Sequence, residues 1–136
     1  MRRWNGWGDE ANGLELPATA DAFLADKLGI ATPLPDATLA SVISKVPASR
    51  LPGHPNIVTT EEDRIRHARG QSLQDWLAMR SGNFGVFPDG VAYPETSDEV
   101  AELLRFCSDR DIVVIPYGGG TSVAGHINPC QSARAI

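Results

Sequence analysis

A short apolar run that leads directly into a glycine-rich turn constrains the fold of this chain more than any other feature. The run is Ile112-Val113-Val114-Ile115, and Pro116-Tyr117-Gly118-Gly119-Gly120-Thr121-Ser122 follows it. A β-branched run that ends at proline is typical of a buried strand, and consecutive glycines are typical of a tightly bent backbone. Such a turn directs several N–H groups at one point, which suits a phosphate or pyrophosphate. Thr121 and Ser122 add hydroxyl donors, so the sequence predicts a nucleotide-cofactor loop.

Two common phosphate-binding motifs do not fit this loop. A Walker A loop requires a lysine after its last glycine, and here His126 follows Gly125. The dinucleotide fingerprint G-x-G-x-x-G, counted from Gly118, requires a further glycine where the chain has Val123. A plain glycine-rich connection without a ligand is the alternative. The preceding strand and the following hydroxyls favour phosphate binding over it.

The composition predicts an ordinary soluble globular chain. Of the 136 residues, 42% are apolar and 21% are charged, and the net charge is −5. The basic residues are scattered, so we expect no nucleic-acid partner, and no stretch approaches the ~20 apolar residues of a membrane helix. Cys107 and Cys130 lack metal-ligand spacing, so we expect no metal site. A reducing, cytoplasmic location is the simplest expectation.

Two short helices are expected early in the chain. The first is predicted over 20–28, capped by Thr19 and ended by Gly29, with its apolar side chains Phe23, Leu24 and Leu28 facing inward. The second is predicted over 37–46, capped by Asp36 and ended by Pro47.

A third helix is expected from Ser72, where Ser72 and Asp75 form an approximate capping box and Gly82 ends the helix. Its residues Leu73, Trp76, Leu77 and Arg80 share one face. Just before it, the segment 64–69 carries three arginines and a histidine. A solvated helix face is the favoured interpretation of that segment, and charges placed near an anionic ligand are the alternative.

The second half of the chain has α/β character. A strand is expected over 91–93, and the capping box of Thr96 and Glu99 opens a helix that ends near Arg110. Cys107 lies on the apolar face of that helix and is expected in the core. With the strand 112–115 this makes a βαβ unit with parallel strands, and the glycine loop lies at a carboxyl strand end, where ligands bind.

Two parallel strands do not make a buried sheet. Because Arg134-Ala135-Ile136 reads as the beginning of another strand, we expect an N-terminal piece of a longer, apparently truncated protein. The predicted organisation is a helical region over 1–85 and an incomplete cofactor domain over 86–136.

The segment from Val91 to Gly125, with its strand–helix–strand unit and P-x-G-G-G-T-S loop, resembles the start of the FAD-binding domain of the p-cresol methylhydroxylase (PCMH, or vanillyl-alcohol oxidase) type. The N-terminal region is similar to alkyldihydroxyacetonephosphate synthases and their bacterial relatives. Four stretches carry that second likeness: Arg3-Trp4-Asn5-Gly6-Trp7-Gly8, Arg66-His67-Ala68-Arg69-Gly70-Gln71-Ser72, Arg80-Ser81-Gly82 and Pro88-Asp89.

The resemblance implies that Pro116, Tyr117, Gly118, Gly119, Gly120, Thr121 and Ser122 hold the FAD pyrophosphate and that Gly125 continues along the cofactor. Relatives with covalent FAD often carry a histidine within the loop. Because Gly119, Gly120 and Thr121 stand there, non-covalent FAD is implied, and His126 is expected to be structural. The family's catalytic residues lie further downstream, so none is expected in this chain and the isolated chain is expected to be inactive.

The implied reaction exchanges the acyl group of acyl-dihydroxyacetonephosphate for a long-chain alcohol in ether-lipid synthesis. Its partners would be FAD and a small or lipid-like substrate, and a homodimer stays open. An FAD-linked D-lactate or glycolate dehydrogenase fragment is the first alternative. An inactive remnant or an interaction module is the second, since the 96–110 helix has a strong apolar face with few strands to cover it.

Overall fold

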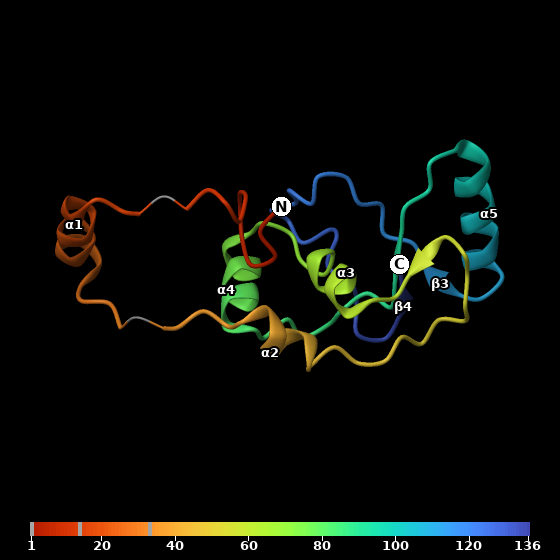
Figure 1. Ribbon diagram of the computed structural model, residues 1–136, viewed down its shortest axis with the longest axis horizontal. Helices are drawn as coiled ribbons and strands as arrows, with labels where there is room; N and C mark the ends of the chain where they lie inside the picture. The colour runs from red at the N-terminus through yellow and green to blue at the C-terminus, as the bar shows by residue number, and fades with distance from the viewer. Residues whose placement is uncertain (1, 14, 33) are drawn as a thin grey trace.

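The computed structural model describes residues 2–13, 15–32 and 34–136 and combines short helices with small sheets, which is the expected α/β class (Figure 1). In chain order the elements are α1 (Ala18–Leu28), α2 (Leu39–Ile43), β1 (Ile57–Val58), α3 (Glu61–Arg66), α4 (Leu73–Ser81), β2 (Val91–Ala92), α5 (Ser97–Ser108), β3 (Ile112–Val113) and β4 (Arg134–Ala135). Within the described residues, no helix has the length and apolar character needed to cross a bilayer.

The predicted capping boxes set the start of the two longer helices in the body of the molecule. Ser72 and Asp75 exchange hydrogen bonds at the start of α4, and Thr96 and Glu99 do the same at α5. Gly82 ends α4 in the left-handed conformation with φ +70°. Both predicted helix starts are confirmed.

The predicted environment of α1 is wrong. The helix begins at Ala18 after Pro17 rather than at a Thr19 cap, and none of its residues is buried. Phe23 is 62% exposed and Leu28 is 81% exposed, because α1 lies apart from the rest of the chain (Figure 1).

The predicted start of α2 is also corrected. Thr38 caps this helix by accepting a hydrogen bond from the Ser41 N–H. Asp36, the expected cap, instead pairs with Arg80 of α4 at 2.7 Å. The α4 face that carries Leu73, Trp76 and Leu77 is exposed, and Asp75 and Met79 are the buried residues of that helix.

The four strands form two separate two-stranded sheets rather than a single unit built from β2 and β3. β2 pairs antiparallel with β1, and β3 pairs parallel with β4, which confirms the strand expected at Arg134–Ala135. The Asp89 N–H donates to the Ala135 carbonyl at 2.7 Å, so β4 is bonded to β3 and to the residues that precede β2. α5 lies between β2 and β3 in the chain, as expected, but the two strands belong to separate two-stranded sheets and do not pair with each other.

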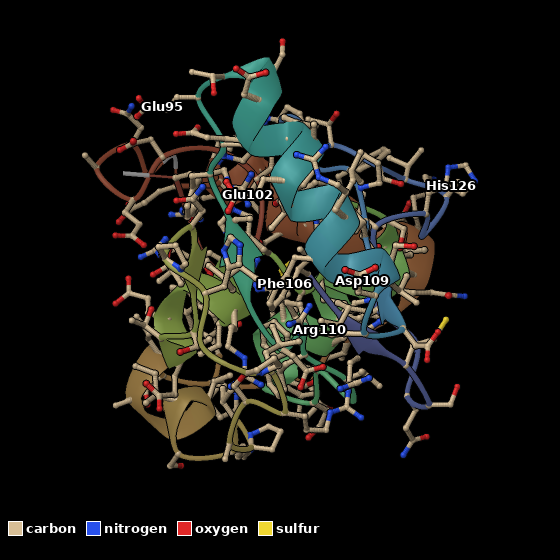
Figure 2. The ribbon with its side chains drawn as sticks, turned by 90° about the vertical axis from the view of Figure 1, so that its right-hand side faces the viewer. Glu95, Glu102, Phe106, Asp109, Arg110 and His126 are labelled. Carbon is tan, nitrogen blue, oxygen red and sulfur yellow. The ribbon has the colours of Figure 1, made fainter. Side chains whose placement is uncertain are left out.

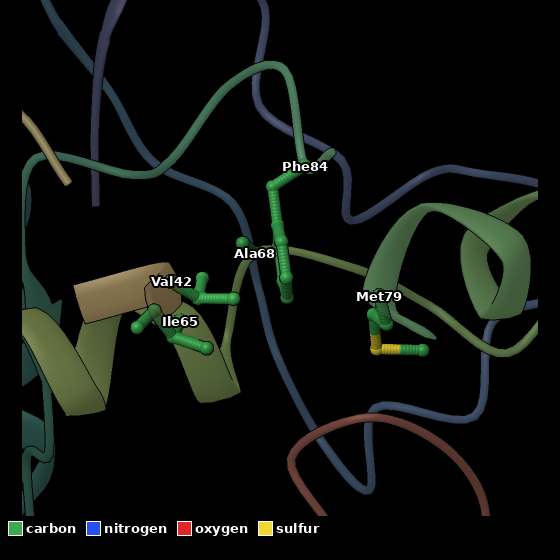
Figure 3. Packing of buried hydrophobic residues seen from close by; sticks show 5 residues of the cluster. All are labelled: Val42, Ile65, Ala68, Met79 and Phe84. Carbon is green, nitrogen blue, oxygen red and sulfur yellow. The ribbon is translucent and has the colours of Figure 1, made fainter. Parts of the chain in front are cut away.

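Two apolar clusters hold the body together. The first joins α2, α3 and α4 through Val42, Ile65, Ala68, Met79 and Phe84 (Figure 3). The second packs Leu103 and Cys107 of α5 against Ile112 and Ile136. Cys107 is therefore a core residue, as expected.

Around α5, the apolar face is only half covered. Val100 and Leu104 remain 40% and 49% exposed. Glu102 is exposed elsewhere on α5, and just beyond the end of the helix the Arg110 guanidinium carbon lies 4.3 Å from the centre of the Phe106 ring (Figure 2).

The segment 64–69 is not the solvated face that its charges suggested. Arg64 is 2% exposed, and its guanidinium donates to the carbonyls of Pro88 and Pro47 at 2.6 and 2.7 Å. Burial lowers the pKa of Arg64, and the two carbonyls supply the acceptors that a buried guanidinium requires. The bond to Pro88 crosses the predicted boundary between residues 85 and 86, which itself stays a prediction.

Candidate cofactor-binding site

The glycine loop leaves β3 and turns back over the body of the molecule. Gly120, the buried glycine of the loop, has φ +67°. A Cβ atom there would lie 2.1 Å from the Tyr117 hydroxyl oxygen, so the turn itself requires glycine.

Gly118 and Gly119 are exposed, and the packing of the chain does not require glycine at either position. A Cβ atom at Gly118 would have no heavy atom within 4 Å, and at Gly119 only Thr121 Cγ2, at 3.6 Å. The two glycines therefore leave open space along the loop.

The backbone of the loop offers unused donors to that space. Within the described part of the chain, the N–H groups of residues 118–122 donate to no acceptor. The Ser122 hydroxyl oxygen is buried and likewise has no hydrogen-bond partner there. Because unpaired polar groups are costly when shielded from water, this arrangement fits an anionic ligand.

Residues 70 and 71 are far from the loop in the sequence but contact it at the Ser122 carbonyl. A Cβ atom at Gly70 would lie 2.2 Å from the Ser122 carbonyl oxygen, which shows how closely the two segments cross. At the same crossing the Gln71 N–H donates to that oxygen at 2.7 Å.

Asn128 connects the loop region to α4. Its Oδ1 accepts the Gly70 N–H at 3.1 Å, and its Nδ2 donates to Asp75 Oδ1 at 2.8 Å. Burial opposes the charge on Asp75, but bonds from Ser72 and Asn128 keep its pKa below the usual value. Gly125, with φ +74°, forms the turn that brings Asn128 into place, since its carbonyl accepts the Asn128 N–H.

The N-terminal segment also reaches the loop. Arg2 donates to the Gly119 carbonyl at 2.9 Å, to the Arg66 carbonyl at 2.7 Å and to the Tyr117 hydroxyl. Sequence analysis missed Arg2 and Asn128, because neither lies in a motif that points to the loop. Gly70 belongs to the N-terminal likeness, but that likeness gave no sign of a contact with Ser122.

A cavity of about 290 Å³ lies between the N-terminal segment and the loop. Arg2, Gly6, Trp7, Gly8, Gln71, Gly119 and Thr121 line it. A second cavity, of about 440 Å³, is mostly apolar and lies between α5, β2 and the start of the loop. Pro116 and Tyr117 border that second cavity, whereas Gly119 and Thr121 border the first, so the loop adjoins both.

The two nearby histidines have different environments. His67 packs against the Tyr117 ring at 4.6 Å and bonds the Asp63 carbonyl through Nδ1 at 2.7 Å. Burial lowers the pKa of His67 and so disfavours the charged form of its ring. His126 is exposed at the edge of the molecule (Figure 2), where the expected structural role finds no support in packing.

Comparison with known proteins agrees with this geometry. Residues 88–133 match the FAD binding domain family. The chain is 35% identical to the alkyldihydroxyacetonephosphate synthase of Dictyostelium discoideum over 71 residues, which are 52% of this chain and 12% of that protein. It is 32% identical to a mitochondrial D-lactate dehydrogenase (cytochrome) of Arabidopsis thaliana over 71 residues, 52% of this chain and 11% of that one.

The fold match extends further than the sequence matches. A solved alkyldihydroxyacetonephosphate synthase structure superposes with a TM-score of 0.75 at 21% identity, over 98% of this chain and 31% of that chain. The chain thus spans about a third of that structure and a smaller share of the two sequence relatives. The chain has the fold of the corresponding part of alkyldihydroxyacetonephosphate synthase, and the match of its residues 88–133 to an FAD binding domain supports FAD as its cofactor.

Proposed function

We propose that this chain is the FAD-binding portion of a flavoenzyme that acts as an alkyldihydroxyacetonephosphate synthase. Such an enzyme exchanges the acyl group of an acyl-dihydroxyacetonephosphate for a long-chain alcohol and forms an ether bond. FAD would supply the reactive centre for that exchange. The residues of this chain bind and orient its phosphates.

One observation carries the proposal: the N–H groups of residues 118–122 have no acceptor within the described chain, beside two glycines that leave open space. Backbone donors gathered in this way bind a pyrophosphate without covalent attachment. In this assignment Gly118, Gly119 and Gly120 approach the phosphates, Thr121 and Ser122 add hydroxyl donors, and Tyr117 fixes the turn. The match to the Dictyostelium synthase supports the choice of reaction.

A 2-hydroxy-acid dehydrogenase is the second candidate. The 32% identity to the Arabidopsis D-lactate dehydrogenase favours it, and both candidates place FAD on the same loop. Assays of the full-length gene product with acyl-dihydroxyacetonephosphate plus a long-chain alcohol, and with D-lactate plus a dye acceptor, separate the two. Turnover of D-lactate without ether-lipid formation would reject the synthase.

The loop assignment is tested by Gly119→Val in the full-length gene product. The fold tolerates a side chain here, because a Cβ atom would make only an ordinary contact and the backbone φ is not positive. The valine instead occupies the space offered to the ligand. We expect FAD affinity to fall by about a hundredfold, on the scale of losing charge-assisted hydrogen bonds, in a titration followed by flavin fluorescence.

Gly53→Val is the matched control, because a Cβ atom at Gly53 meets no described atom within 4 Å beyond its chain neighbours and the residue lies far from the loop in the sequence. This variant should bind FAD as the wild type does. If Gly119→Val retains stoichiometric FAD at wild-type affinity, the loop does not bind the cofactor.

A further inference from the structure

The N-terminal segment folds into a small hairpin that lies against the glycine loop. Arg2 and Asp9 form an isolated antiparallel bridge, and the Arg3 N–H donates to the Gly8 carbonyl at 2.9 Å. This arm, defined as residues 2–9, places Arg2 at the loop and Trp7 and Gly8 on the wall of the smaller cavity. The sequence separation between Arg2 and Gly119 is 117 residues.

The hydrogen bonds of Arg2 at the loop go to neutral acceptors, so no carboxylate balances its positive charge in these contacts. Its three acceptors are the carbonyl oxygens of Gly119 and Arg66 and the Tyr117 hydroxyl, all of them neutral. Within the described residues Arg2 takes part in no ion pair. Its guanidinium also lies 5.5 Å from the centre of the Tyr117 ring.

The neighbouring arginine is different. Arg66 pairs with Glu62 at 2.7 Å and with Glu10 at 3.3 Å, so its charge is balanced. It also donates to the Arg2 carbonyl at 2.7 Å, which fixes the arm on α3. Of these two arginines, Arg2 is therefore the one whose positive charge remains available beside the loop.

The cavity next to Arg2 has the size and lining for a diphosphate group. Its volume of about 290 Å³ equals the space of roughly ten water molecules. Gly119 and Thr121 line it from the loop, and their backbone N–H groups have no acceptor within the described residues. Arg2 lines it from the arm and supplies the cationic group that a glycine turn by itself lacks.

We propose that this cavity is the subsite for the FAD pyrophosphate, and that the N-terminal arm forms one of its walls, with Arg2 as a phosphate-binding residue. The inference rests on the proposed function, since it assumes that the loop binds FAD. It adds a binding residue from a segment outside the matched FAD domain. Arg2 acts in two ways: its charge attracts the phosphates, and its bonds hold Gly119 and Tyr117 in the shape that receives them.

The test is a titration of the flavin-free, full-length gene product with FAD at several salt concentrations, for the wild type and for Arg2→Ala, Arg2→Lys and Arg3→Ala. Arg3 is the matched control, since it lies on the same arm but does not line the cavity. Circular dichroism verifies that each variant is folded.

We expect Arg2→Ala to weaken FAD binding at least tenfold, the scale of a charge-assisted hydrogen bond, and Arg3→Ala to change it less than twofold. Salt screens the attraction between an exposed positive charge and the phosphates. Removing the Arg2 charge should therefore also make the FAD affinity less dependent on salt concentration. Arg2→Lys should keep the wild-type salt dependence while losing part of the affinity.

Equal affinities of Arg2→Ala and Arg3→Ala would overturn the inference and leave the loop assignment intact. A weaker affinity with an unchanged salt dependence would also overturn it, since Arg2 would then act through loop shape alone. If the wild type takes up no FAD at all, the proposed function fails, and this inference fails with it.

Discussion

Adjacent glycines in the loop are required for different reasons. At Gly120 the left-handed backbone and the Tyr117 hydroxyl leave no room for a side chain. At Gly119 the space is open, so the protein's own packing does not explain the absence of a side chain, and the proposed ligand, approaching the backbone, would explain it. Stability and cofactor affinity should therefore respond to different positions of the same turn.

Gly120→Ala should destabilise the fold by about 2 kcal/mol. Alanine is strained at the positive φ of this position, and its Cβ atom would push the Tyr117 hydroxyl away from its hydrogen bonds with Arg2 and Arg66. Urea unfolding followed by circular dichroism measures the change in free energy. Gly119→Ala is the matched control and should stay within about 0.5 kcal/mol of the wild type. Equal effects of the two substitutions would contradict the assigned difference.

Asp89 gives a pH-dependent prediction. The carboxylate is 2% exposed and accepts hydrogen bonds from the Arg50 side chain, at 2.8 and 2.6 Å, and from the Ala135 N–H. Burial raises its pKa, but the bonds from Arg50 and Ala135 outweigh burial and leave the pKa below its usual value. The charged form therefore stabilises the fold above about pH 4, the unfolded value, and that contribution is lost as the pH falls through the lower folded pKa.

Asp89→Asn should thus cost about 2 kcal/mol at pH 7, a reduced value because Arg50 is half-exposed, and the cost should shrink below about pH 4. Chemical denaturation at several pH values measures it, with Asp98→Asn on the exposed side of α5 as control. A cost that stays constant from pH 7 to pH 3 would exclude the charged pair as its source.

At the scale of elements, the sequence predicted those helix ends and strands that are determined by residues close together in the chain. The capping boxes of α4 and α5, the Gly82 cap and the strand before the loop all follow from patterns within a few positions. α1 shows where that reasoning fails. Its local pattern is helical, but whether Phe23 and Leu28 are buried depends on a partner element, and none lies against them.

The same reason explains which parts of the site were found. The glycine loop is contiguous, so a cofactor-binding role could be predicted for it from the sequence, and that role stays a prediction. Arg2, Gly70 and Asn128 reach it from separate segments, and no local pattern records such contacts. Arg64 was misread because its charge suggested solvent, whereas the carbonyls that permit its burial come from two prolines at 17 and 24 residues' distance.

For the molecule as a whole, the loop is held by contacts that span the chain. The arm, the segment at residues 70 and 71, and α4 through Asp75 and Asn128 all contact the loop or its supporting turn. The match to the FAD binding domain begins only at residue 88, so much of what positions the loop lies before it. The larger apolar cavity adjoins the same loop through Pro116 and Tyr117.

The central claim is that this loop binds FAD without a covalent bond. The most direct measurement is an absorbance spectrum of the purified full-length gene product, recorded before and after acid precipitation. We predict a flavin band that moves entirely into the supernatant. A band that stays with the precipitate would contradict non-covalent binding, and a colourless protein that takes up no added FAD would contradict the claim itself.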